Sequence, residues 1–280
     1  MTLFIYFMKT ELKTKFPSWV TEKQDRHLIM TNDLDSVLSC TLLNQVQGYE
    51  VNAYYSFDGL GLIKNDKKKL IGVDLAMTGE KLCWDNHVTG LTKNSHYNPN
   101  SANINTILGI HAETSYNYTQ KMAFSTALQV WSYYDIPLPK TDEGKMLLLS
   151  IDSSFLGFYN DKFKPIFTKY MKMLEFEELL EFCERHTKND FYKFKYQYTE
   201  HLNFTDGLIT YKSRQFVEDC LGFKLYIPDE KFIQIMSFDT NRKYISSVHD
   251  LSRDEKVFSY AIINAKEVKY SNFIFNNKGD

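Results

Sequence analysis

The sequence is poor in the residues that mark several classes of protein. It holds only four cysteines among its 280 residues, and no two of them form a Cys-x-x-Cys pair. This pattern suggests neither a zinc site nor a disulfide framework, and it favours a reducing compartment, the cytoplasm. The chain also has just five arginines and a net charge of −2, so it lacks the basic field that many proteins use to hold long duplex DNA.

Long hydrophobic runs are also missing. The apolar run 3–8 is far too short to cross a bilayer, and it lacks the basic leader and the small-residue cleavage site of a signal peptide. No other stretch approaches the length of a membrane span, so we expect a soluble protein with no membrane partner. With 43% hydrophobic and 24% charged residues, the composition is typical of a globular protein of one large or two modest domains.

The first candidate site is the sequence Thr-Asn-Asp-Leu-Asp-Ser, which begins at Thr31 and places Asp33 and Asp35 two residues apart. An apolar run, 27–30, precedes it and predicts a strand, while the helical spacing of 37–47 predicts a helix. Open parallel sheets bind ligands at such strand-to-helix turns. Two carboxylates aimed at one point favour a divalent cation between them, and hard oxygen ligands suit Mg²⁺ or Mn²⁺. The alternative is that both aspartates only cap the helix.

Three later segments repeat the arrangement of an apolar run that ends in polar side chains. These segments are 70–73 before Asp74, 81–84 before Asp85-Asn86-His87, and 146–151 before Asp152. Periodicity does not decide whether the last of these runs is a strand or a buried helix. Because the carboxyl ends of parallel strands meet at one edge of a sheet, a single crevice can collect these side chains.

In order and spacing these segments resemble the motifs of the DHH phosphoesterases. That family includes RecJ-type single-strand exonucleases, nano-RNases, cyclic-dinucleotide phosphodiesterases and family II inorganic pyrophosphatases. Four motifs carry the resemblance: Asp33-Leu34-Asp35 as an Asp-x-Asp motif, Asp74 as a lone strand-terminal Asp, Asp85-Asn86-His87 in place of Asp-His-His, and Asp152 before two serines. The likeness covers roughly residues 27 to 160.

The resemblance implies an α/β fold in which a parallel sheet is flanked by helices, with a smaller C-terminal mixed α/β domain. It divides the chain into a metal-binding catalytic domain at 1–160, a helical linker at 161–200 and a substrate-capping domain at 201–280. Periodicity also predicts helices over 118–134 and 163–185, and β-rich segments between 208 and 275.

The resemblance further implies a metal-dependent phosphoesterase that hydrolyses a phosphodiester of a small nucleotide or of a short single-stranded nucleic acid. Its roles fall on the following residues: Asp33, Asp35, Asp74 and Asp152 as ligands of Mn²⁺ or Mg²⁺, His87 as the proton donor, Asp85 as the residue that orients a neighbouring group, and Asn86 and Arg242 as substrate contacts. For Arg242 a solvated turn is the alternative to a phosphate contact.

Two departures from the family pattern support a second hypothesis. Asn86 stands where the family usually has a metal-binding His, and the Gly-Gly-Gly-His signature of many relatives is missing from the sequence. Both favour a DHH-like binding module that sequesters a nucleotide or docks on a protein partner. A third interpretation is a chance match in a generic α/β protein. The sequence also leaves the oligomeric state open, a homo-oligomer included.

The segment 92–106 is dense in Asn and Ser. One interpretation is a long surface loop that ends at Ser101, the N-cap of a helix. The other is a polar loop at the mouth of the site, beside His87, because loops of this length often have a function.

Overall fold

The computed structural model of the chain describes residues 8–200, 202–249 and 251–274. Most of the apolar run 3–8 and the end of the last β-rich segment, at Phe275, lie outside these ranges. None of the helices in the described part of the chain has both the length and the apolar character that a bilayer span requires.

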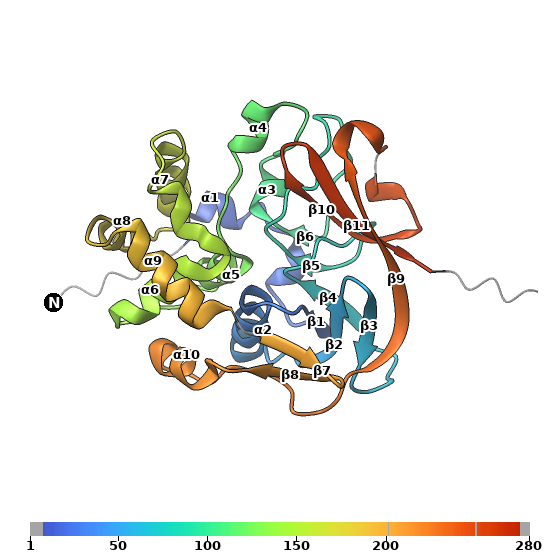
Figure 1. The fold of residues 1–280 in the computed structure, drawn as a ribbon. Coiled ribbons are helices and arrows are strands. Elements are labelled where there is room, and N and C mark those ends of the chain that lie inside the picture. Colours follow the sequence, from blue (N-terminus) through green and yellow to red (C-terminus); the bar gives the residue numbers. More distant parts are fainter. Residues whose placement is uncertain (1–7, 201, 250, 275–280) are drawn as a thin grey trace, which may run out of the picture.

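Most strands of the described residues form one nine-stranded sheet of order β10-β11-β9-β3-β2-β1-β4-β5-β6 (Figure 1). One half is parallel: β2 (Val51–Ser56), β1 (Arg26–Met30), β4 (Lys69–Val73), β5 (Cys83–Trp84) and β6 (Ser101–Ala102). The other half is antiparallel: β3 (Gly59–Leu62), β9 (Ile233–Tyr244), β11 (Glu267–Phe273) and β10 (Val257–Asn264). The predicted α/β class is confirmed, but the sheet is mixed, because a tight turn after β2 sends β3 back beside it.

Helices cover the sheet, and α6 to α10 gather on the side away from the C-terminal strands (Figure 1). Their bounds are α1 (Thr10–Lys13), α2 (Leu34–Gln47), α3 (Ile104–Ile107), α4 (Ser115–Thr119), α5 (Thr126–Tyr133), α6 (Asp142–Ser150), α7 (Lys164–Met173), α8 (Glu177–Glu184), α9 (Lys188–Phe194) and α10 (Arg214–Leu221). Short helices η1 (Ser18–Val20), η2 (Ile151–Gly157), η3 (Lys195–Thr199), η4 (Ile245–Ser247) and η5 (Leu251–Arg253) and a separate hairpin, β7 (Leu202–Thr205) with β8 (Leu208–Tyr211), complete the described elements.

Strand β1 is buried on both of its faces. Leu28 and Met30 point to the large cluster formed with the helices, whereas Ile29 between them points to a second cluster beneath the C-terminal strands. Successive side chains of a strand point to opposite faces, so a strand buried on both faces is apolar throughout. This explains the unbroken apolar run that marks β1 in the sequence.

The helix predicted over 37–47 is confirmed as α2. Asp33 caps it, since its carboxylate accepts a hydrogen bond from the backbone N–H of Ser36. Gly48, with φ 66°, ends it in the left-handed conformation that glycine adopts at little cost, and its N–H bonds to the carbonyl of Asn44.

The C-terminal strands curl over the ends of the parallel strands. Strand β9 pairs with β3 along its first half and with β11 along its second half. Strand β10 then reaches the loops that follow β4 and β5, where Ser259 bridges to Met77 and Ile262 to Val88. The division of the chain at about 160 and 200 stays a prediction, but these contacts join the C-terminal strands to the parallel half.

Three local predictions were wrong in part. The helix expected over 118–134 is interrupted: α4 ends at Thr119, and α5 begins only after Ser125, whose hydroxyl caps it. The helix expected over 163–185 is two helices, α7 and α8, because Glu175 between them has φ 56°. Ser101 lies in β6, and Asn103 is the residue that caps α3. The run before Asp152, left open above, is helical (α6).

Candidate metal centre

Asp33 and Asp35 lie where β1 passes into α2, and each has a capping role. Asp33 caps α2, as described above. The buried carboxylate of Asp35 accepts the backbone N–H groups of Thr126 and Ala127, both at 2.7 Å, so it caps the start of α5 instead. The capping alternative is therefore correct in part. It does not exclude a cation, because each carboxylate oxygen has a second lone pair.

Asp74 follows directly on β4 and has φ 56°. The hydroxyl of Thr126 donates to its carboxylate at 2.9 Å, so the start of α5 contacts both Asp35 and Asp74. The hydroxyl of Ser36 accepts the N–H of Thr31 and donates to the carbonyl of Val73, which ties the ends of β1 and β4 together. These bonds fix Asp74 beside the Asp33–Asp35 turn.

Asp152 lies in η2, immediately after α6. Asp152 has φ 53° and Ser153 has φ 56°, a left-handed conformation that is uncommon for serine. Strained backbone of this kind often occurs at functional sites. The hydroxyl of Ser154 accepts the N–H of Ser125 and donates to the carbonyl of Ile151, so this turn too is held by the start of α5.

Three of the four predicted metal ligands come together. Asp35, Asp74 and Asp152 each offer an oxygen within 4.8 Å of the others. Burial raises the pKa of Asp35 and Asp74 well above the usual range of a carboxyl group, and repulsion between the aspartates adds to the rise. Burial and the charge of Asp152 raise the pKa of Asp33, the residue that caps α2, to about 6. A divalent cation would relieve this repulsion, so an all-oxygen donor set fits Mg²⁺ or Mn²⁺.

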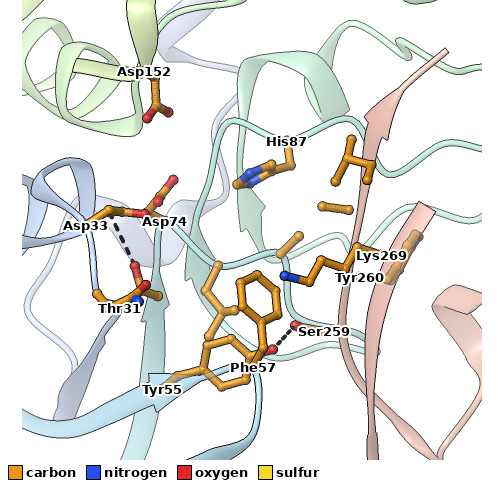
Figure 2. A pocket seen from close by; sticks show the side chains of 15 residues that line it. Thr31, Asp33, Tyr55, Phe57, Asp74, His87, Asp152, Ser259, Tyr260 and Lys269 are labelled. Atoms are coloured by element: carbon orange, nitrogen blue, oxygen red, sulfur yellow. Dashed lines mark hydrogen bonds between the residues drawn. The ribbon is translucent and has the colours of Figure 1, made fainter. Parts of the chain in front are cut away.

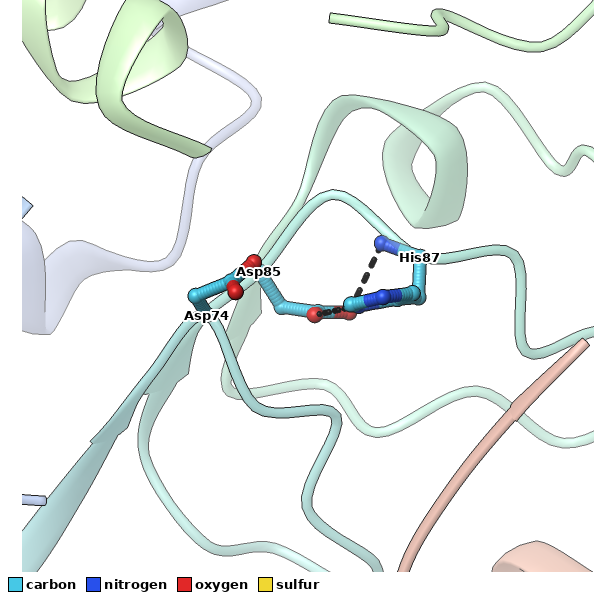
Figure 3. Close-up of side chains that lie close together, drawn as sticks. All are labelled: Asp74, Asp85 and His87. Carbon is cyan, nitrogen blue, oxygen red and sulfur yellow. Dashed lines mark hydrogen bonds and ion pairs between the residues drawn. The ribbon is translucent and has the colours of Figure 1, made fainter. Parts of the chain in front are cut away.

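Asp85 and His87 form a bonded pair at the end of β5 (Figure 3). The buried carboxylate of Asp85 binds Nδ1 of His87 at 2.7 Å and also accepts its backbone N–H. Burial lowers the pKa of His87, but the charge of Asp85, its hydrogen bond to the ring and the charges of Asp74 and Asp152 together outweigh burial and raise the pKa to about 10. Asp74, Asp85 and His87 form a second group of ligand atoms within 4.8 Å. A carboxylate on one ring nitrogen fixes the orientation of the other, which is the contact expected of an orienting Asp85.

Asn86 contacts the carboxylate cluster through its amide N–H₂. Its Nδ2 donates to the carbonyl of Phe124 at 2.8 Å and lies 3.4 Å from Oδ2 of Asp152. The Asn-rich segment supports this turn from within: the amide of Asn103 donates to Asp85, and that of Asn105 donates to the carbonyl of Asn86. Two amides of 92–106 therefore hold the Asp-Asn-His turn.

A cavity of about 160 Å³ separates these residues from the C-terminal strands (Figure 2). Its lining comes from both halves of the sheet and from η2. The parallel half and its loops supply Thr31, Asn32, Asp33, Tyr55, Phe57, Asp74, Leu75, Ala76 and His87, η2 supplies Asp152, and the antiparallel half supplies Ser259, Tyr260, Ala261, Ile263 and Lys269. Small-molecule sites usually measure a few hundred Å³. The space therefore suits a group the size of a phosphate with part of its substituent.

The structure does not bring Arg242 to this cavity. Its guanidinium lies on β9 and pairs with Glu267, at 2.6 Å between Nη2 and Oε2, and 61% of the side chain is exposed. Its partner in the neighbouring strand β11 is Lys269, and that side chain does line the cavity. Lys269 was not predicted from the sequence because no local motif marks it. Its position opposite the aspartates depends on the pairing of β9 with β3 and with β11.

The ammonium of Lys269 rests on an aromatic ring. Its Nζ lies 3.0 Å from the centroid of the Phe57 ring, and burial lowers the pKa of the amine. Beside it, the hydroxyl of Tyr55 contacts the hydroxyls of Ser259 and Ser271. The wall of the cavity formed by Lys269, Ser259, Tyr55 and Phe57 therefore offers a cation, hydroxyls and aromatic faces to a ligand, opposite the carboxylates.

Comparisons of the chain with protein-family models, with curated proteins and with solved structures found no match.

Proposed function

We propose that this protein is a metal-dependent phosphoesterase that hydrolyses a phosphodiester of a small nucleotide or of a short single-stranded nucleic acid. One observation carries the proposal: Asp35, Asp74 and Asp152, from three distant segments, converge at the ends of the parallel strands. Asp35 and Asp74 are buried and Asp152 is exposed. Carboxylates that only repel one another would destabilise the fold, most of all where they are buried, so their convergence favours a bound cation. The order of the motifs, which resembles that of the DHH phosphoesterases, supports the same class of reaction.

The three converging aspartates would hold Mn²⁺ or Mg²⁺, with Asp33 at the edge of the group. When bound, such an ion acidifies a water molecule and neutralises charge on phosphate oxygens. The protein's own contribution on this side is rigidity. Asp35 is fixed by two backbone N–H groups and Asp74 by a hydroxyl, so neither carboxylate has to be reorganised when substrate arrives.

His87 moves the proton in this proposal. Asp85 holds Nδ1 of the ring, which leaves Nε2 as the atom that donates to a phosphate oxygen or to the leaving oxygen. Lys269, on the opposite wall, contacts a non-bridging phosphate oxygen and orients the substrate. Arg242 has no part in this proposal, because Glu267 already pairs with its guanidinium.

Size and charge favour a small substrate. The cavity measures about 160 Å³, and a net charge of −2 supplies no overall basic field to hold a long strand. A reducing compartment such as the cytoplasm suits the four cysteines, which are buried and unbridged.

One observation favours the alternative, a DHH-like module that binds a nucleotide without hydrolysing it. Asn86 occupies the position of a family metal ligand, yet its amide N–H₂, a donor, is the group that faces Asp152. A donor cannot bind a cation, so one metal site of the family would be lost.

The experiment is a hydrolysis assay with a cyclic dinucleotide and short oligonucleotides, run with Mn²⁺ and with Mg²⁺. Asp74→Asn should reduce the rate at least about 100-fold, because even outer partners of a metal contribute 10- to 100-fold. The exposed Asp161→Asn is the matched control and should keep full activity. Metal-dependent binding without hydrolysis would support the binding module, whereas neither binding nor hydrolysis would contradict both hypotheses.

A further inference from the structure

A second cavity, of about 400 Å³, lies on the helical side of the molecule. Its volume is in the range of small-molecule sites. It is lined by residues of α4, η2, α7 and α9 and of the loops between them: Tyr118, Thr119, Lys121, Ala123, Phe124, Ser154, Leu156, Gly157, Asn160, Phe163, Ile166, Phe167, Tyr170, Lys188 and Tyr192. None of these residues belongs to the first cavity.

The lining is aromatic and basic. Six of its side chains carry rings, and the rings of Phe124 and Phe167 pack edge to face with centroids 5.0 Å apart. No acidic side chain is among the described residues that line it, but Lys121 and Lys188 are. Such a lining complements a ligand that has a flat apolar body and a negative charge.

Both lysines lie against aromatic rings. The ammonium of Lys121 is 4.6 Å from the centroid of the Tyr118 ring and 3.0 Å from its hydroxyl. The ammonium of Lys188 is 5.5 Å from the centroid of the Tyr192 ring. A cation over an aromatic face keeps a charge that no carboxylate balances and keeps N–H groups for a ligand, whereas a direct pair with a carboxylate would neutralise that charge.

We propose that this second cavity is a binding site for a small aromatic anion, a planar ring system that carries one carboxylate or phosphate group. The rings would enclose the flat body, and Lys121 and Lys188 would bind the anionic group. An aromatic acid and a mononucleotide share this chemistry. The site does not depend on whether the carboxylate cluster binds a metal, since the two cavities have separate linings.

The site adjoins the candidate metal centre through η2. This short helix contributes Asp152 to the first cavity and Ser154, Leu156 and Gly157 to the second. Phe124 is a second connection: its carbonyl accepts the amide of Asn86, and it lines the second cavity. A ligand there would contact the turn that carries Asp152.

The test is calorimetric titration of the metal-free full chain with 2-naphthoate, with its neutral analogue 2-naphthamide, and with AMP. We expect 2-naphthoate or AMP to bind, and 2-naphthoate to bind more tightly than 2-naphthamide. The double variant Lys121→Gln/Lys188→Gln should weaken binding of the anion at least about tenfold and leave the amide unchanged. Lys172→Gln/Lys193→Gln, which removes two exposed lysines of α7 and α9 outside the lining, is the matched control.

Two further variants locate the ligand. Ala123 is exposed and lines the cavity, so Ala123→Trp should block the site in a folded protein. Lys269→Gln, in the first cavity, should leave the binding of 2-naphthoate unchanged. The proposal is overturned if the native protein binds none of the probes at millimolar concentration, if the double variant binds the anion as well as the native chain, or if Lys269→Gln abolishes the binding of 2-naphthoate. If 2-naphthoate binds more tightly than AMP, the site prefers an aromatic acid. If AMP binds more tightly, the site prefers a mononucleotide.

Discussion

The two walls of the first cavity differ in how they are held in place. On the parallel side, Asp74 lines the cavity and Asp35 lies beside it, and the two are bound by a hydroxyl and by backbone N–H groups at the start of α5. On the antiparallel side, the charged group is Lys269, which rests on the ring of Phe57. The first wall is rigid and acidic, whereas the second is a flexible cation on an aromatic support.

This difference suggests a division of roles within the proposed function. A rigid set of carboxylates suits a cation whose geometry has to be fixed before the reaction. A lysine with a flexible stem suits the binding of a phosphate whose position varies among substrates. Changes to the acidic wall should therefore abolish metal binding, and changes to the lysine wall should only weaken substrate binding.

The largest effects should come from the aspartates of the acidic wall. They should separate metal binding from the hydrogen bonds that hold the start of α5. Asp152→Asn and Asp35→Asn should both reduce Mn²⁺ affinity, at least about 100-fold. Only Asp35→Asn should also lower the free energy of unfolding, by about 1–3 kcal/mol, because an amide cannot accept both N–H groups at the start of α5. Urea unfolding of the metal-free variants measures this, and equal stability of the two would contradict it.

A smaller effect is expected on the lysine wall. Lys269→Gln should weaken the binding of a nucleotide about tenfold, because it removes a charged donor to phosphate, and leave Mn²⁺ affinity unchanged. Arg242→Gln is the matched control from the paired position of β9 and should change neither. If Arg242→Gln had the larger effect, the assignment of the phosphate contact to Lys269 would be wrong.

The pH dependence of stability tests the acidic wall without a substrate. Folding raises the pKa of Asp33 from 3.8 to about 6 and that of His87 from 6.5 to about 10. The folded state thus holds more protons than the unfolded state, so the stability that Asp33 contributes is lost as pH rises through about 6, and that of His87 as pH rises through about 10. Thermal unfolding in EDTA should show a lower melting temperature at about pH 8 than at about pH 5.5. A melting temperature that rises with pH would contradict this.

The smallest effect should follow the loss of the aromatic support. Phe57→Leu removes the ring under Lys269 and should weaken nucleotide binding about two- to fivefold, the range of one partly exposed cation–π contact. Tyr116→Leu, at an exposed ring outside both cavities, is the control. Equal affinities of Phe57→Leu and the native protein would show that Lys269 needs no such support.

The two walls also differ in how far the sequence predicts them. The Asp33–Asp35 turn and Asp74 follow from local patterns, because a strand end and a helix start are marked by neighbouring residues. The strand or helix before Asp152 stayed open, since a short apolar run fits both. Lys269 was not found, because its place depends on pairing between β3 and β9, which are far apart in the chain. Arg242 lies one strand away from the residue that lines the cavity.

The central claim is that the converging aspartates bind a divalent cation, and calorimetric titration of Mn²⁺ into the metal-free protein tests it most directly. The account predicts saturable binding by the native chain that is lost in Asp74→Asn and kept in Asp161→Asn. Native protein that binds no Mn²⁺, or an Asp74→Asn variant that binds it equally well, would contradict the claim.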